Sequence, residues 1–369
     1  QRLSSASFQS RRRGVCKTRQ MTTETLPEEL QRALEDLKRD YEAFEVSERG
    51  ANGYVVFARN RISGVEVAIK FYYGAPGERR HDEPRLLASI RSPNVLPIID
   101  ARNLSEELAF FLTPRCGDGD LDNLIAARPS ALQAIDLALG IATGASAIHA
   151  HRLIHRDLKP ANVVCDNGVP LIADFGSVRR LEEGEEEVPA SGHSVLYRPP
   201  ESFDTGRYGI RGDVYQVGLI TYQLLGGSLP YDPMAYLSRS DQREYSKLSG
   251  DFEKSKFVDN VIHRLAASGR LMDLQSLPPW VGRGAKAALR EMTDPDPQQR
   301  LANMAEVAAR LTQIRSDMRD WRWSGDIARL EWKDRIIELR PLGNGCYEPL
   351  QAKGDTFRRI PGMPNGPLS

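Results

Sequence analysis

Residues 154–164 read IHRDLKPANVV, and residues 165–168, which follow directly, read CDNG. An Asn-Gly pair between two apolar runs predicts a β-hairpin with a two-residue turn. With this pair in the turn, antiparallel pairing places Asn162 opposite Ala173 and therefore next to Asp174. Opposed residues in such a pair have Cα atoms about 5 Å apart. The hairpin is thus expected to bring an amide and a carboxylate to the same end of a small sheet.

The side chains of Asn162 and Asp174 are suited to a shared cation. An amide oxygen and a carboxylate are hard ligands, and magnesium is typically held by one or two such protein groups together with phosphate oxygens. The spacing therefore predicts a magnesium site with Asn162 and Asp174 as its protein ligands.

A second informative stretch is VEVAIKF, residues 65–71, whose alternation is typical of a strand with one buried face. Ala68 and Lys70 lie on the less apolar face. A small side chain there leaves room for a flat base, and an ammonium group can reach phosphate oxygens. Taken alone, the pattern is better explained by an ordinary edge strand. The apolar face is predicted to carry Val65, Val67, Ile69 and Phe71.

Upstream, residues 48–58 read ERGANGYVVFA, with Gly50 and Gly53 around a predicted tight turn. Glycines let backbone N–H groups approach phosphates closely. Two glycines in a hairpin are also what an ordinary turn needs, so this segment by itself leaves both interpretations open.

Length and composition limit the class of protein. The 369 residues exceed the usual size of one domain, so two structural units are expected, with a single unit as the alternative. An apolar share of 40% and a charged share of 27% are typical of a globular protein. The 50 basic and 50 acidic residues cancel, which removes the global electrostatic case for binding nucleic acid or a membrane surface. No stretch approaches 18 consecutive apolar residues, so no membrane span is expected.

The cysteines are widely spaced and form no Cys-x-x-Cys pair. A structural zinc site or a disulfide framework is therefore not expected, and a reducing, cytoplasmic location fits best. The four residues are Cys16, Cys116, Cys165 and Cys346.

The two ends of the chain differ from its middle. Residues 1–24 are predicted to be a basic, disordered leader. Residues 1–20 are Ser- and Arg-rich and contain no acid, which also resembles a transit peptide, and Met21 is a plausible independent start. Residues 25–43 are predicted to form an amphipathic helix, opened by a capping box of Thr25 and Glu28, that packs on the main domain. Residues 314–369 are predicted to be an extension.

Within this extension, residues 327–340 fit either a short strand pair or a helix, because their periodicity does not decide. Residues 341–369 contain ten Gly or Pro and are predicted to be a loop or disordered.

The ordered set of motifs resembles the eukaryotic-type serine/threonine protein kinase family, from about residue 44 to about residue 313. Each motif alone is unspecific, but the set in this order is specific. The motifs are VAIK (67–70), HRDLKPAN (155–162), DFG (174–176), PPE (199–201), DVYQVG from Asp213, and Asp296-Pro297-x-x-Arg300.

The resemblance implies an α+β, bilobal protein kinase fold. A small β-rich N-lobe with one main helix is expected over residues 44–113, and a larger, mainly α-helical C-lobe over residues 114–313. It also implies ATP and Mg²⁺ as cofactors and a protein with Ser or Thr hydroxyls as the substrate. It says nothing of the oligomeric state.

The resemblance assigns roles to the motif residues. Lys70 would hold the α- and β-phosphates and pair with Glu83 on the following helix, and Asn162 and Asp174 would bind magnesium. Asp157 would accept the proton of the substrate hydroxyl, and Lys159 would neutralise the transferring phosphoryl group. Lys159 also marks the serine/threonine branch of the family.

The resemblance further implies a nucleotide cleft with a hinge over residues 110–121. Thr113 would be its gatekeeper, the backbone N–H of Cys116 would meet adenine, and Asp120 would contact the ribose; for Cys116 the alternative is a plain buried thiol. The remaining predicted cofactor-binding residues are Gly50, Gly53, Val55, Ala68 and Lys70.

Three residues depart from the pattern of the family. Glu48 replaces the first glycine of the glycine-rich loop. Pro84 directly follows Glu83, which predicts that this helix starts late and that the ion pair with Lys70 is conditional. Gln216 stands where serine is usual, and the sequence connects it to no chemistry.

Regulation and structure add two further expectations. Arg156 precedes the catalytic Asp157, and we hypothesise that it engages either phosphorylated Ser191 or the acidic run at residues 182–187; a solvated acidic loop is the alternative. Glu201 and Arg300 are expected to form an ion pair inside the C-lobe.

The leading function is therefore a serine/threonine protein kinase. A pseudokinase scaffold is the alternative favoured by Glu48 and Pro84, and opposed by the intact motif residues. A small-molecule kinase of the aminoglycoside or choline type is disfavoured, because such enzymes lack the landmarks matched by residues 199–201, Asp213 and Arg300.

Overall fold

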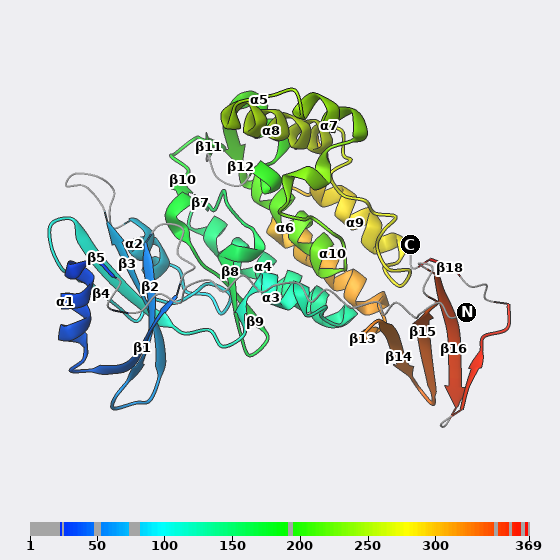
Figure 1. Cartoon of the computed structure of the whole chain (residues 1–369), viewed down its shortest axis with the longest axis horizontal. Coiled ribbons are helices and arrows are strands. Elements are labelled where there is room, and N and C mark those ends of the chain that lie inside the picture. Colours follow the sequence, from blue (N-terminus) through cyan, green and yellow to red (C-terminus); the bar gives the residue numbers. More distant parts are fainter. Residues whose placement is uncertain are drawn as a thin grey trace, which may run out of the picture. The chain divides into compact units, whose positions relative to one another are not determined.

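The structure is a computed structural model that describes residues 23, 26–47, 53–73, 82–190, 195–342, 346–353, 356–362 and 366–367. The chain divides into two compact units, Gln1–Glu78 with Ile99–Arg115 and Arg79–Ile98 with Cys116–Ser369. The first is mainly β and the second is mainly helical, so the fold is α+β, as predicted (Figure 1). Apart from Thr23, the predicted leader lies outside the described residues.

The first unit is built on a five-stranded antiparallel sheet in the order β1-β2-β3-β5-β4. Alternation along the strands gives the sheet one strongly apolar face, which is buried. The strands are β1 (Tyr41–Ser47), β2 (Tyr54–Asn60), β3 (Glu66–Tyr73), β4 (Asp100–Asn103) and β5 (Leu108–Pro114).

Helix α1 (Glu28–Leu37) covers this apolar face. Leucines recur along it at helical spacing, and Leu30, Leu34 and Leu37 are buried in one cluster with residues of β2, β3 and β5. An amphipathic helix gains most of its stability from such packing. The helix therefore belongs to the core of the first unit.

The predicted helix over residues 25–43 is too long at its N-terminal end. The helix begins at Glu28, with Pro27 in an extended conformation as its N-cap residue and no side-chain cap. The predicted capping box is therefore not the start of the helix, and Thr25 lies outside the described residues. Proline provides a fixed φ at a position where a helix has no N–H partner to lose.

The C-terminal end of this helix was also predicted wrongly. Tyr41 and Phe44 continue the helical spacing of the leucines, but they lie in β1, where Tyr41 pairs with Asn60 of β2. Both rings still pack on the same core. Tyr41 gains a strand partner, and Phe44 lies in a bulge of the same strand, between Glu42 and Glu45. The apolar contacts are kept in the strand, so the spacing alone was misleading.

The second unit contains most of the helices. They are α2 (Asp82–Ser89), α3 (Leu121–Ala126), α4 (Ala131–Ala150), α5 (Pro200–Thr205), α6 (Ile210–Leu224), α7 (Arg239–Tyr245), α8 (Asp251–Ala267), α9 (Arg283–Thr293) and α10 (Met304–Asp317). Three small sheets join them. These are β6 (Gly119–Asp120) with β8 (Val163–Asp166) and β9 (Val169–Ile172), β7 (Leu153–Ile154) with β10 (Arg179–Arg180), and β11 (Glu187–Pro189) with β12 (Arg207–Gly209).

Helix α4 is the central helix of this unit. Among the described helices it alone has the length and apolar composition that could cross a membrane, with a mean hydropathy of 1.5. It packs instead against α6, α10 and β9, and its residues Ile135, Ile141 and Ile148 are fully buried. Its apolar character is that of an interior helix.

The C-terminal extension folds into an antiparallel sheet, drawn orange to red in Figure 1. Residues 327–340 are a strand pair, not a helix, and the prediction of a loop over residues 341–369 is wrong. Leu350 and Ala352 of this tail are buried, as are Ala328 and Leu330. The strands are β13 (Arg322–Ser324), β14 (Ile327–Trp332), β15 (Arg335–Pro341), β16 (Cys346–Lys353), β17 (Thr356–Arg359) and β18 (Gly366–Pro367).

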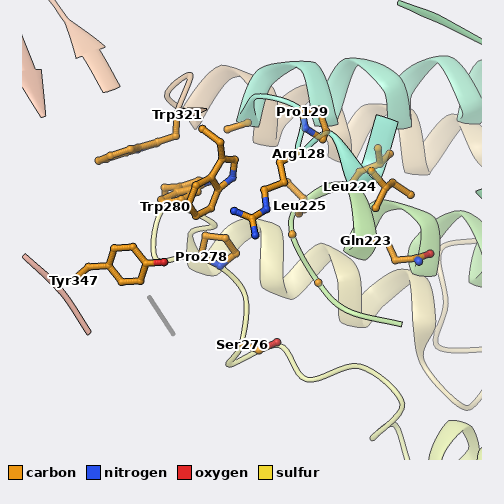
Figure 2. Close-up of a pocket in the computed structure, with 15 residues that line it drawn as sticks. Arg128, Pro129, Gln223, Leu224, Leu225, Ser276, Pro278, Trp280, Trp321 and Tyr347 are labelled. Carbon is orange, nitrogen blue, oxygen red and sulfur yellow. The ribbon is translucent and has the colours of Figure 1, made fainter. Parts of the chain in front are cut away.

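This sheet is joined to the helical part at the start of α4. The backbone N–H of Ala131 donates to Trp321 O over 2.9 Å. The rings of Trp280 and Trp321 stack with centroids 5.1 Å apart. Figure 2 shows these rings beside Arg128 and Tyr347, around a cavity of about 300 Å³. The junction therefore rests on aromatic packing that the sequence did not predict.

The predicted ion pair between Glu201 and Arg300 is present. The two guanidinium nitrogens Nη1 and Nη2 of Arg300 each lie 2.7 Å from an oxygen of Glu201, and the Arg300 side chain is fully buried. The pair links α5 to the loop before α10.

Candidate active site

The hairpin of β8 and β9 has the predicted register. Asp166 pairs with Val169 and Val163 pairs with Ile172, with the Asn-Gly turn between the two strands. The N–H of Ala173 donates to Asn162 O over 2.9 Å, which continues the pairing by one residue. Counting from the turn therefore placed Asn162 and Ala173 correctly.

Asn162 is buried and oriented by Asp157. Its Nδ2 donates to the backbone O of Asp157 over 2.7 Å and to Asp157 Oδ2 over 3.0 Å. Because the amide nitrogen is used in this way, the amide oxygen is the atom of Asn162 that can face a cation.

Asp157 has two carboxylate oxygens in different surroundings. Oδ2 accepts hydrogen bonds from Asn162 and from Lys159 Nζ, the latter over 2.8 Å. Oδ1 is buried and accepts no hydrogen bond from the part of the chain that the structure describes. A buried oxygen of this kind is costly for stability alone, and it suits a group that receives a proton.

Asp174 has an unusual backbone conformation. Its φ of 56° and ψ of 78° lie in the left-handed region, which costs energy for a residue other than glycine. It follows Ala173, whose backbone O lies 3.2 Å from His155 Nε2, and it precedes Phe175, whose ring packs edge-on against His155. The strained residue is thus held from both sides.

The donor set of Asn162 and Asp174 fits magnesium. One amide and one carboxylate match the few hard oxygen ligands that a protein supplies when substrate phosphates supply others. The residues present thus agree with the group that the resemblance implies.

The loop of residues 155–159 is held by Asp213 of α6, which the sequence marked only as a landmark. Asp213 Oδ2 accepts from the N–H of His155 over 2.9 Å and lies 2.7 Å from His149 Nε2. Oδ1 accepts from the N–H of Arg156 over 2.9 Å and from the Tyr208 hydroxyl over 3.1 Å. The supporting roles of His149 and Tyr208 could not be found from the sequence, since neither belongs to a motif.

The surroundings of Asp213 set its pKa. Burial alone would raise the pKa of this carboxyl, but the hydrogen bond and charge of His149, with smaller effects of His155 and Arg156, bring the pKa below its ordinary value of 3.8. A carboxyl with a lowered folded-state pKa stabilises the fold above its unfolded-state pKa. That contribution is lost as the pH falls through the folded-state pKa.

Below about pH 4, we therefore expect the melting temperature of the wild type to decrease more steeply with falling pH than that of Asp213→Asn, which cannot titrate at this position. The variant is also expected to melt lower near neutral pH. Calorimetry between about pH 7 and pH 3 measures both, and the exposed Asp204→Asn is the control. If the melting temperatures of Asp213→Asn and the wild type depended on pH in the same way, the lowered pKa of Asp213 would be contradicted.

In the first unit, four of the predicted nucleotide-binding residues share one face of the sheet. Lys70 pairs with Val55 on one side, and Ala68 pairs with Thr113 on the other. Directly paired residues point to the same face, and this is the face opposite α1. Lys70 Nζ also lies 5.8 Å from the centroid of the Phe111 ring.

One residue of this strand was placed wrongly. Val65 was predicted to lie on the buried face, but β3 begins at Glu66 and Val65 is 51% exposed. The N–H of Asn60 donates to Val65 O, so Val65 closes the β2–β3 turn rather than packing in the core. Val67, Ile69 and Phe71 are buried as predicted.

The structure explains why residue 53 is a glycine. Its φ is +155°, and a Cβ placed on it would lie 2.0 Å from the backbone O of Phe71. The backbone at the start of β2 thus lies so close to β3 that a side chain at position 53 does not fit. Glu48 and Gly50 lie outside the described residues, so their predicted roles at phosphates remain predictions.

Gly53→Ala is expected to reduce the free energy of unfolding by about 3 kcal/mol, because the added methyl group meets backbone atoms that cannot move aside. Gly64→Ala is the matched control: its φ is +71°, but no atom lies within 4 Å of the added Cβ. A loss of about 1 kcal/mol is expected there from the backbone alone. Urea unfolding measures the free energy of unfolding of both variants. Equal losses would contradict the close approach of residue 53 to the backbone of Phe71.

Pro84 does not delay the helix that carries Glu83. Helix α2 begins at Asp82, so Glu83 is its second residue and Pro84 its third. A proline in the first turn removes no intrahelical hydrogen bond, which is why the helix tolerates it. The late start was predicted wrongly, and the pairing of Glu83 with Lys70 remains a prediction.

Cys116 and Asp120 lie beside the catalytic hairpin. Burial, followed by the charges of Asp166 and Asp118, raises the pKa of the Cys116 thiol to about 11, so this thiol is neutral. Asp120 pairs with Val164 of β8. Its Oδ1 accepts from the N–H of Asn123 over 3.1 Å and caps α3. Its predicted contact with the ribose therefore coexists with a structural role.

Arg156 is buried against the segment after Asp174. Its Nε donates to the backbone O of Ser177 over 2.6 Å, and its Nη1 donates to that of Pro189. Burial, followed by the charge of Arg179, lowers the pKa of Arg156 to about 10. Ser191 lies outside the described residues, so the hypothesis of its phosphorylation remains a prediction.

The acidic run contacts a different arginine. Arg207 of β12 donates to the backbone O of Glu187 over 2.7 Å, and its Nε lies 3.3 Å from Glu187 Oε2. Glu185 Oε1 lies 3.9 Å from the same guanidinium. These contacts order the run next to the β11–β12 pair.

Comparison with known proteins agrees with this arrangement. Residues 41–311 match the protein kinase domain. The chain is 29% identical over 271 residues to the mitogen-activated protein kinase HOG1 of Blumeria graminis, covering 68% of this chain and 73% of that protein. It is 31% identical over 203 residues to the DNA damage-responsive serine/threonine-protein kinase RqkA of Deinococcus radiodurans, covering 52% of this chain and 30% of that protein.

A third relative is the serine/threonine-protein kinase pkn2 of Myxococcus xanthus, 30% identical over 207 residues, which cover 52% of this chain and 25% of that protein. The chain thus spans less than a third of the length of the two bacterial relatives. The matched region contains the hairpin, the strand of Lys70 and the Glu201–Arg300 pair, so the chain belongs to the protein kinase family.

Proposed function

We propose that this chain is an active serine/threonine protein kinase that transfers the γ-phosphoryl group of Mg-ATP to Ser or Thr hydroxyls of proteins. The observation that carries the proposal is the convergence of Asp157, Lys159 and Asn162, with Asp174 one residue beyond the hairpin pairing. Phosphoryl transfer needs placement and charge neutralisation more than covalent help, and this group of side chains supplies both.

Asp157 is the group that accepts the proton of the substrate hydroxyl. Lys159 and Asn162 hold its Oδ2, which orients the carboxylate and leaves the buried Oδ1 to receive the proton. Lys159 has a side chain that is 21% exposed, so its ammonium can also face the transferring phosphoryl group.

Asn162 and Asp174 would hold the magnesium ion. When bound, this ion neutralises charge on the phosphates. The oxygen of Asn162 is available for this role because Asp157 engages its nitrogen.

The nucleotide is proposed to lie against the face of Val55, Ala68, Lys70 and Thr113. Ala68 leaves space for the base, and Lys70, supported by Glu83, meets the α- and β-phosphates. Gly50, Gly53, the backbone N–H of Cys116 and Asp120 complete the proposed nucleotide contacts.

The preference for Ser and Thr rests on Lys159 and on the similarity to relatives that are serine/threonine-protein kinases.

Two measurements separate an active kinase from a pseudokinase scaffold. The melting temperature with and without Mg-ATP reports nucleotide binding, and phosphate incorporation from γ-labelled ATP reports transfer. The proposal expects a raised melting temperature and incorporation by the wild type, with incorporation lost in Asp174→Asn. A raised melting temperature without incorporation would favour the scaffold and overturn the proposed activity.

A further inference from the structure

Gln216 lies on α6 where related kinases usually carry serine, and it is almost completely buried, with 1% of its surface exposed. Its Oε1 accepts from the N–H of Leu158 over 2.7 Å. Its Nε2 donates to the backbone O of Arg156 over 3.4 Å and to that of Tyr197 over 3.2 Å. All three partners are backbone atoms outside α6.

The contacts of Gln216 lie on both sides of Asp157. The O of Arg156 belongs to the peptide group before the Asp157 Cα, and the N–H of Leu158 belongs to the peptide group after it. The orientations of these two peptide groups define φ and ψ of Asp157, and hence the direction of its side chain. One amide side chain therefore holds both peptide groups that aim the carboxylate.

No regular ladder holds this part of the loop, so side chains satisfy its backbone. Asp213 accepts from the N–H groups of His155 and Arg156, and Asn162 donates to the O of Asp157. Gln216 completes the set. Buried peptide groups need such partners, and losing one costs the full desolvation of the group left behind.

The chemistry of the amide suits this position and a shorter side chain does not. One partner is a donor and two are acceptors, which orients Oε1 toward Leu158 and Nε2 toward the two carbonyls. A serine hydroxyl ends two bonds closer to the helix and cannot span the same three atoms. Gln216 thus makes a set of contacts that a serine at this position could not make.

We propose that Gln216 is a positioning residue for phosphoryl transfer, which holds Asp157 in its reactive direction and ties it to the segment of Tyr197 that precedes α5. This inference rests on the proposed kinase activity. Gln216 touches no reacting atom; it acts through the backbone of the catalytic loop. A misplacement of about 1 Å in a catalytic group can cost about 100-fold in rate.

The test compares Gln216→Met with Gln223→Met. Methionine keeps the length of the side chain and removes the amide. Gln223 is also a buried glutamine of α6, and its Oε1 accepts from the Tyr197 hydroxyl over 2.8 Å; among the described residues it forms no hydrogen bond with the peptide groups on either side of the Asp157 Cα. Both variants lose a buried amide, and Gln216→Met leaves more groups without a partner, so its melting temperature is expected to fall further than that of Gln223→Met.

Only Gln216→Met is expected to lose turnover. We expect its kcat to fall by about 10- to 100-fold, with KM for ATP changed by less than about twofold, and Gln223→Met to keep kcat within about twofold of the wild type. An unchanged kcat in a folded Gln216→Met variant would overturn the proposal. A loss of kcat in both variants would overturn it too, because the effect would then be one of stability.

Amide hydrogen exchange at Leu158 tests the hydrogen bond from this N–H to Gln216 independently of activity. In the wild type without nucleotide, this N–H is expected to be protected by Gln216, and to exchange at least about 10-fold faster in Gln216→Met but not in Gln223→Met. If Gln216→Met does not fold, wild-type exchange at the rate of an unprotected amide still overturns the proposal. If the wild type transfers no phosphate, only the proposed kinase activity is refuted. The exchange rate at Leu158 still decides whether Gln216 holds the backbone next to Asp157.

Discussion

Asp157→Asn is expected to lower kcat by about 10²- to 10⁴-fold while leaving the fold intact. Asparagine keeps the shape of the side chain, and its oxygen can still accept from Lys159 and Asn162, as Asp157 Oδ2 does. The atom at the place of the buried Oδ1 becomes an amide nitrogen, which cannot receive the proton of a substrate hydroxyl. Steady-state phosphate transfer from labelled ATP measures the effect.

Asp136→Asn is the control for the loss of one negative charge. Asp136 lies on α4, 21 residues before Asp157 in sequence, and forms a half-exposed ion pair with Arg315. Its kcat is expected to match the wild type. A near-normal kcat for Asp157→Asn would refute the assignment of the proton acceptor.

Arg300→Met is expected to reduce the free energy of unfolding by about 3–5 kcal/mol, the usual cost of breaking a buried ion pair from one side. The substitution removes a fully buried guanidinium from Glu201, whose own side chain is only 13% exposed. It also removes donors from the backbone O atoms of Asp294 and Pro295. Urea unfolding monitored by fluorescence gives the loss directly.

Two further variants separate the effect of the ion pair on stability from the effect of replacing an arginine by a methionine. Arg315→Met breaks the half-exposed pair with Asp136 and is expected to cost less than about 1 kcal/mol. Glu201→Gln combined with Arg300→Met is expected to recover part of the loss, because no unpaired charge remains buried. A loss below about 1 kcal/mol in Arg300→Met would contradict the role of the pair.

The parts of the fold that were predictable from sequence depend on local rules. The Asn-Gly turn determines the register of the hairpin, so Asn162 and Ala173 could be paired by counting alone. The alternation of β3 likewise predicts that Ala68 and Lys70 lie opposite the buried face. In both cases neighbouring residues carry the information.

The wrong predictions concern segments whose structure is decided by distant partners. The spacing of Tyr41 and Phe44 fits a helix, but pairing with β2 makes this segment a strand. The Gly- and Pro-rich tail was predicted to be a loop, yet β16 pairs with β15 and buries Leu350. Turn residues show where strands are interrupted, and they do not exclude strands between the interruptions.

The supporting residues of the site were missed for the same reason. His149, Tyr208 and Gln216 contact the catalytic loop or Asp213 from positions up to 64 residues away in sequence. Only Gln216 left a signal, as a departure from the serine of related kinases. The sequence showed that it was unusual, and its three backbone contacts show why.

The most direct test of the account is phosphate transfer from Mg-ATP by the purified wild-type chain to an array of peptides that carry Ser, Thr or Tyr as the single acceptor. The account predicts label on Ser or Thr peptides, and none when Asp157→Asn replaces the wild type. Transfer to no peptide, in a protein whose melting temperature Mg-ATP still raises, would contradict it.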